Sequence, residues 1–94
     1  MNDRQKRFFE YLSYIQESSV QKCMAEHHLT DTETESILYD VTFETITSVL
    51  EMLDGYSGFS SNRLDIVDTV TGEMLNENPT IELHDHNEDH LRYE

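Results

Sequence analysis

The residues best suited to chemistry lie near the C-terminus, where residues 84–90 contain three histidines and three carboxylates. If this segment is helical, His86 and His90 share a face, as do Asp85 and Asp89, because residues four apart lie side by side on a helix. Imidazole and carboxylate groups together suit Zn²⁺, Ni²⁺ or Cu²⁺. The pattern gives one hypothesis, a small protein that binds zinc or nickel. Its metal ligands would be His84, Asp85, His86, Asp89 and His90.

The same segment matches no established metal-binding motif. His86 is followed by Asn87, which departs from the helical zinc-hydrolase pattern, and the segment lacks the central glycine of a calcium loop. A tract rich in histidine and acid is also what a solvated tail contains, and the composition favours that interpretation. We therefore treat residues 84–94 as an acidic, histidine-rich tail, either flexible or ordered. We expect no cofactor unless zinc or nickel binds there.

A second set of carboxylates, Asp40, Glu44 and Glu51, falls on one face of a helical segment. Paired carboxylates perform acid–base catalysis only where a pocket of low dielectric separates their pKa values. The sequence offers no accompanying nucleophile motif, and its three glycines form no loop that would cradle a phosphate. We therefore expect these carboxylates to be exposed and the protein not to be an enzyme.

The segment after residue 54 offers further candidates for contact with a partner. Tyr56 and Phe59 lie in a loop beside two glycines, where they would either anchor a partner or cap the helices. Acidic side chains also line the hairpin that the pattern predicts further on. The predicted interaction surface comprises Asp40, Glu44, Glu51, Tyr56, Phe59, Asp65, Asp68 and Glu73.

The net charge narrows the class of partner. The 94 residues include 20 Asp and Glu against 6 Lys and Arg, which gives a formal charge of −14. Residues 1–22 carry four bases and three acids, whereas residues 23–94 carry two bases and seventeen acids. So acidic a body repels nucleic acid and attracts basic proteins.

Three functions remain compatible with this charge. The first is a non-enzymatic protein-interaction module, of the kind that small bacterial inhibitor or immunity proteins use against a basic toxin or nuclease. The second is the metal-binding protein described above, and the third is an accessory domain whose acidity serves solubility alone. The lone Cys23 and the lack of a signal peptide or a long apolar run indicate a cytoplasmic protein without a membrane span.

The elements that must position these residues follow from hydrophobic periodicity. Residues 3–27 and a segment from about residue 32 to residue 53 predict two antiparallel helices, the second preceded by a capping-box pattern at Thr30 or Thr32. Alternation over residues 64–75 predicts a small β-hairpin. Residues 80–83 are predicted to form a short strand or the start of a helix. The prediction is one α+β domain over residues 1–94, two long helices with a hairpin and a polar C-terminal segment. A mostly α fold is the alternative.

The packing of the first helix is also open to prediction. Phe8, Leu12 and Ile15 lie on one face, and Phe9 and Val20 extend the apolar stripe to the neighbouring face. We expect the aromatic residues of this helix to be core. Two helices and a hairpin bury little surface, so the sequence also predicts a homodimer formed through the first helix.

Overall fold

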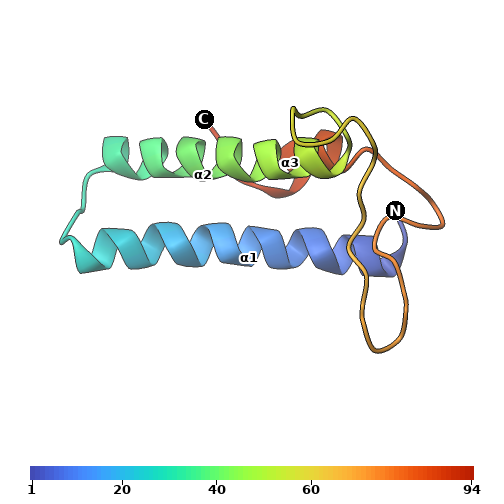
Figure 1. Ribbon diagram of the computed structural model, residues 1–94. Coiled ribbons are helices and arrows are strands. Elements are labelled where there is room, and N and C mark those ends of the chain that lie inside the picture. The colour runs from blue at the N-terminus through green and yellow to red at the C-terminus, as the bar shows by residue number, and fades with distance from the viewer.

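Two long antiparallel helices form the body of the protein in the computed structural model, which describes residues 1–94 (Figure 1). Helix α1 spans Asp3–Glu26 and helix α2 spans Thr32–Leu53, and they are followed by a 3₁₀ helix, η1 (Leu83–His86), and a single turn, α3 (Asn87–His90). The two predicted long helices are confirmed. The molecule is elongated, with extents of 43 × 28 × 22 Å.

Each long helix begins at a side chain that satisfies free backbone donors. Asn2 and Gln5 form a reciprocal capping box at the start of α1. Helix α2 begins after Asp31, whose carboxylate accepts the backbone N–H of Thr34 at 2.9 Å and whose pKa is lowered by its hydrogen bonds from that residue. The expected cap at Thr30 or Thr32 was therefore wrong by one residue.

The core is small and occupies only one side of α1. Its buried apolar residues fall into two clusters, one around Phe9, Leu50, Leu75 and Leu83 and another around Val20, Met24 and Tyr39. The expectation that the aromatic residues of α1 are core holds for Phe9 but not for Tyr11 or Tyr14, which are 63% and 61% exposed.

The predicted β-hairpin is wrong, because the protein contains no strands and its fold is all-α. The chain does reverse between Ile66 and Leu75, but only one isolated antiparallel bridge forms, between Val67 and Met74. The physical reason lies in the aspartates: Asp65 Oδ1 accepts two backbone N–H groups and Asp68 Oδ1 accepts two more. Ile66 accepts the Leu75 N–H, but its own N–H, which would return that bond in a ladder, donates to Asp65. Asp68 closes the turn between the two segments.

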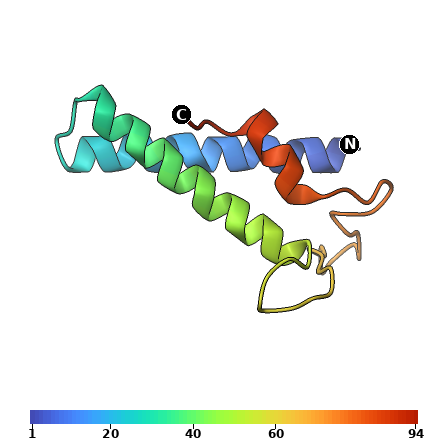
Figure 2. The ribbon, with the colours of Figure 1, turned by 90° about the horizontal axis from the view of Figure 1, so that it is seen from above.

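The C-terminal segment, residues 84–94, packs against both long helices. Figure 2 shows α2 crossing α1 and diverging from it, with α3 in the angle between them. Leu83, Asn87 and Leu91 are buried there. The segment then runs back along α2, so it lies beside the very helix that carries the predicted acidic face.

Candidate functional site

A strip of unpaired carboxylates runs along α2 and the C-terminal segment. Asp40, Glu44 and Glu51 lie on one face of α2, as the sequence spacing predicts. The expected exposure holds for Glu44 only, because Asp40 and Glu51 are half-buried. The strip gains three more carboxylates from the segment that packs beside it. We call this set the acidic strip: Asp40, Glu44, Glu51, Glu88, Asp89 and Glu94.

Specific contacts hold the two halves of the acidic strip together. The buried amide of Asn87 donates to Thr47 Oγ1 at 2.8 Å, and the backbone N–H of Glu94 donates to Asp40 Oδ1 at 2.7 Å. Between these points the Tyr93 ring packs on Phe43, with centroids 4.5 Å apart. The fold therefore places carboxylates that are about forty residues or more apart in sequence along one side of the molecule.

No base neutralises the acidic strip. None of its six carboxylates lies within 4.0 Å of a lysine, arginine or histidine, whereas Arg4, Lys22, Arg63 and Arg92 each pair with an acid elsewhere. The nearest arginine or lysine along the chain, Arg92, stacks over the Tyr39 ring at 4.0 Å and reaches Glu35. The strip consequently carries uncompensated negative charge.

The loop carboxylates of the predicted surface do not join the strip. Asp65 binds the backbone N–H groups of Ile66 and Asn76, and Glu73 pairs with Arg4 at 3.0 Å. Asp68 closes a turn, and its hydrogen bonds from Val70 and Thr71 lower its pKa. These three groups shape the loop, so the predicted surface separates into two parts.

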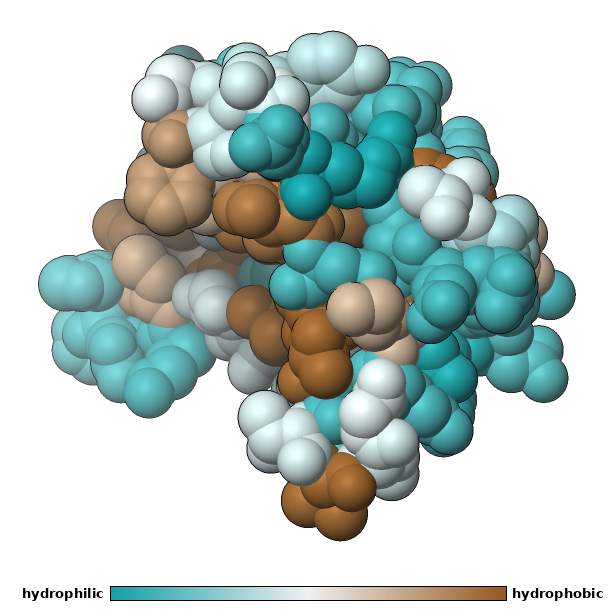
Figure 3. Space-filling view, turned by 45° about the vertical axis from the view of Figure 1, so that its right-hand side comes forward, coloured by the Kyte–Doolittle hydropathy of each residue, from teal (hydrophilic) through white to brown (hydrophobic).

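Tyr56 and Phe59, the two predicted aromatic anchors, lie in the loop that follows α2, at the end of the helix pair from which the loops extend. Tyr56 is 64% exposed and meets the His84 ring edge-on with centroids 5.1 Å apart, while Phe59 is 74% exposed. Figure 3 shows this end, where hydrophobic side chains reach the surface in separate patches among hydrophilic ones. The structure thus ties Tyr56 to the C-terminal segment and leaves Phe59 projecting into solvent.

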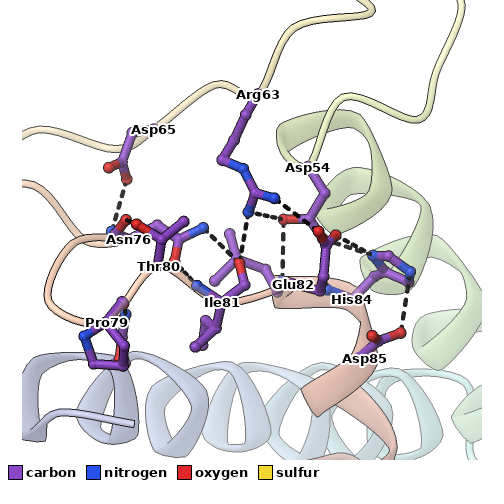
Figure 4. A network of polar contacts seen from close by, with 12 residues as sticks. Asp54, Arg63, Asp65, Asn76, Pro79, Thr80, Ile81, Glu82, His84 and Asp85 are labelled. Atoms are coloured by element: carbon purple, nitrogen blue, oxygen red, sulfur yellow. Dashed lines mark hydrogen bonds and ion pairs between the residues drawn. The ribbon is translucent and has the colours of Figure 1, made fainter.

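The best-organised polar centre joins the end of α2 to the C-terminal segment (Figure 4). The fully buried Asp54 carboxylate accepts the backbone N–H groups of Leu83 and His84 at 3.0 and 2.9 Å and contacts His84 Nδ1 at 2.6 Å. Arg63 bridges to Glu82 at 2.7 Å. Burial favours the neutral imidazole, but the hydrogen bond with Asp54 and the charges of nearby carboxylates outweigh it and raise the pKa of His84.

The same centre contains the one group of three side chains with the spacing to hold a metal ion. Ligand atoms of Asp54, Glu82 and His84 lie within 4.8 Å of one another, and one Glu82 oxygen is buried without a hydrogen-bond partner. A cation there would have to displace the Arg63 guanidinium from Glu82 and open the 2.6 Å contact between Asp54 and His84. The group is therefore a polar contact that holds the C-terminal segment to the end of α2, not an open metal site.

The five predicted metal ligands are not brought together. His90 stacks on the Phe9 ring with centroids 5.0 Å apart, and His86 lies 6.1 Å from the same ring. Asp85 reaches only the outer nitrogen of His84, and Asp89 is exposed. Of the predicted set, His84 alone belongs to the group that has ligand spacing.

Sequence reasoning missed the buried amides that connect the segments. Gln16 donates to the carbonyl oxygens of Tyr39 and Arg92 and accepts the Arg92 N–H, which ties α1 to α2 and to the C-terminal segment. Gln5 donates to the Pro79 carbonyl at 2.6 Å. The sequence does contain a sign of these contacts. Both glutamines lie on the same face of α1 as Phe9, and a polar side chain buried on such a face needs hydrogen-bond partners.

The comparisons with known proteins add no relative. No protein-family model, curated protein or solved structure matches the chain. Neither long helix is apolar enough along its length to cross a membrane. The candidate site therefore rests on the geometry and charge of this chain alone.

Proposed function

We propose that the protein is a non-enzymatic interaction module that binds a basic protein through the acidic strip. The observation that supports this proposal is the absence of any cation within 4.0 Å of the six strip carboxylates, although every arginine of the chain except Arg7 pairs with an acid. Uncompensated charge on one side attracts an oppositely charged surface and orients it during encounter.

The proposed partner is a folded or extended chain rich in lysine and arginine. Since exposed ion pairs weaken as salt screens them, the complex should form quickly and depend strongly on ionic strength. An inhibitor or immunity protein directed against a basic toxin or nuclease is the form of this function that the charge favours. The lone Cys23 supports a reducing, cytoplasmic setting for it.

The test compares two variants of equal net charge. The strip variant combines Asp40→Asn, Glu44→Gln and Glu51→Gln, and the control combines three exposed acids outside the strip that pair with no base, Asp3→Asn, Glu10→Gln and Glu77→Gln. Binding of an oligolysine peptide is measured by isothermal titration calorimetry at low and physiological ionic strength. Each variant loses three negative charges, so a difference between them reports position and not net charge.

We expect the strip variant to bind about tenfold more weakly than the wild type, because three surface charge pairs are lost, and the control to stay within about twofold. Equal loss in both variants would indicate attraction by net charge alone. Undetectable binding by the wild type would favour acidity that serves solubility, the third function considered above.

A further inference from the structure

A shallow groove between α1 and α2 lies on the side of the helix pair away from the C-terminal segment. It encloses about 220 Å³. The C-terminal segment contacts Asp40, Phe43 and Thr47, which point to the other side of α2 by helical spacing. The groove is lined by Ile15, Gln16, Ser19, Thr42, Thr45 and Ile46. Of these, the buried Gln16 also hydrogen-bonds the backbone of Arg92 in the C-terminal segment.

This side of the helix pair carries no charged residue along its central part, although the chain has a net charge of −14. On α2, the side chains that share the groove side are aliphatic residues, threonine, serine and methionine. On α1, they are aromatic, aliphatic and serine side chains, with the bases Arg4 and Arg7 at one end of the face and Lys22 at the other. We call these residues the uncharged face: Phe8, Tyr11, Leu12, Ile15, Ser18 and Ser19 of α1, and Ile37, Leu38, Val41, Thr42, Thr45, Ser48, Val49 and Met52 of α2.

Large apolar side chains of the uncharged face remain open to solvent. Val41 is 54% exposed, Val49 47% and Ile15 43%. Phe8, Leu12 and Ile15 form the stripe that hydrophobic periodicity marks as one face of the first helix, but only the neighbouring face is fully buried. Phe8 and Leu12 touch the core with one side and stay half-buried, and Ile15 is exposed. A helix pair with apolar residues on two sides has only one side covered.

The chain exposes more surface than a compact monomer of its mass. A folded monomer of 11.1 kDa exposes about 5,700 Å², whereas this chain exposes 6272 Å². Its radius of gyration is 15.0 Å, against about 12.4 Å for a compact chain of this length. The chain as a whole thus exposes about 600 Å² more than a compact monomer, and the open side chains of the uncharged face contribute to that excess. Each partner of a stable interface buries roughly 800 Å².

We propose that a second copy of this chain packs on the uncharged face, so that two helix pairs form a four-helix bundle. A basic partner would find no carboxylate in the groove, whereas a second copy presents the same uncharged surface. In a two-fold arrangement, both copies use the same face and the acidic strips point outward on opposite sides. Contact at the groove is thus the geometry that brings two chains of charge −14 together with their carboxylates apart.

The test is the mass in solution, measured by sedimentation equilibrium at tens of micromolar protein and physiological salt. We expect twice the chain mass of 11.1 kDa. Thr45→Lys places a cation in the groove, and its control Glu44→Lys places the same side chain one residue earlier, on the acidic strip. Both variants reduce the net negative charge, so neither weakens the dimer through general repulsion.

We expect Thr45→Lys to raise the dimer dissociation constant at least about tenfold, since it buries unpaired ammonium groups. Glu44→Lys should dimerise as the wild type does. Added salt should strengthen the wild-type dimer by screening repulsion between the two copies, which needs no variant to fold. The proposal is overturned by a monomeric wild type, by a Thr45→Lys variant that dimerises normally, by loss of the dimer in Glu44→Lys, or by a dimer that salt weakens. Because the acidic strip stays free in this dimer, loss of oligolysine binding and loss of the dimer are separate results.

Discussion

The Asp54 carboxylate fixes the start of the C-terminal segment against the end of α2, and its removal should destabilise the whole chain. Asp54 accepts three hydrogen bonds, two of them from the backbone N–H groups of Leu83 and His84. Hydrogen bonds to a charged acceptor contribute about 1.5–3 kcal/mol each, and the relief of desolvating a buried carboxylate offsets part of that sum. We therefore expect Asp54→Ala to lower the free energy of unfolding by about 3–5 kcal/mol.

Urea denaturation followed by circular dichroism measures this change. The control is Asp85→Ala, which removes an exposed carboxylate that contacts the same histidine at 3.2 Å and should change the free energy of unfolding by no more than about 0.5 kcal/mol. If Asp54→Ala unfolds within about 1 kcal/mol of the wild type, the two N–H groups find other partners, and the role assigned to this carboxylate is incorrect.

Three further predictions concern the contributions of Gln16, Gly55 and His84 to stability. Gln16→Ala should lower the free energy of unfolding by about 2–4 kcal/mol in the same assay, because it orphans buried backbone groups of Tyr39 and Arg92. Gly55→Ala should cost about 1–3 kcal/mol, since Gly55 has φ +88° and an added Cβ would lie 3.0 Å from the Asn62 backbone; Gly58→Ala, which meets open space, should be neutral and serves as its control. The raised pKa of His84 means that the stability contributed by its charge is complete below the unfolded pKa of about 6.5 and is lost as pH rises through the folded pKa. A His84→Gln variant should lack that loss in unfolding curves recorded across this pH range, and an identical pH dependence in the variant would show that His84 does not contribute it.

The long helices could be predicted because hydrophobic periodicity, capping residues and stop residues all lie within each helical segment or next to it. Helix α2 ends at Asp54-Gly55 as expected, since Gly55 adopts the left-handed conformation that closes helices. The prediction of the hairpin was wrong because a strand depends on where its backbone N–H groups bond, which apolar alternation does not show. Alternation of apolar residues indicates a strand only if the backbone donors stay free, and Asp65 binds the Ile66 N–H locally.

The candidate site was predictable only in part. The spacing of Asp40, Glu44 and Glu51 placed them on one face of α2, because helical periodicity fixes it. The contributions of Glu88 and Glu94 depend on where the C-terminal segment packs, and that is decided by long-range contacts of Asn87 and Leu91 that leave no local pattern. The choice between the two apolar faces of α1 likewise depends on what packs against them.

The most direct test of the acidic strip is a nuclear magnetic resonance titration of the isotope-labelled wild type with oligolysine at physiological salt. We expect the largest chemical-shift changes in backbone amides of residues 40–51 and 88–94, along the two segments that form the strip. Changes centred on residues 65–73, or spread evenly over all exposed acids, would contradict the assignment of this strip as the binding surface.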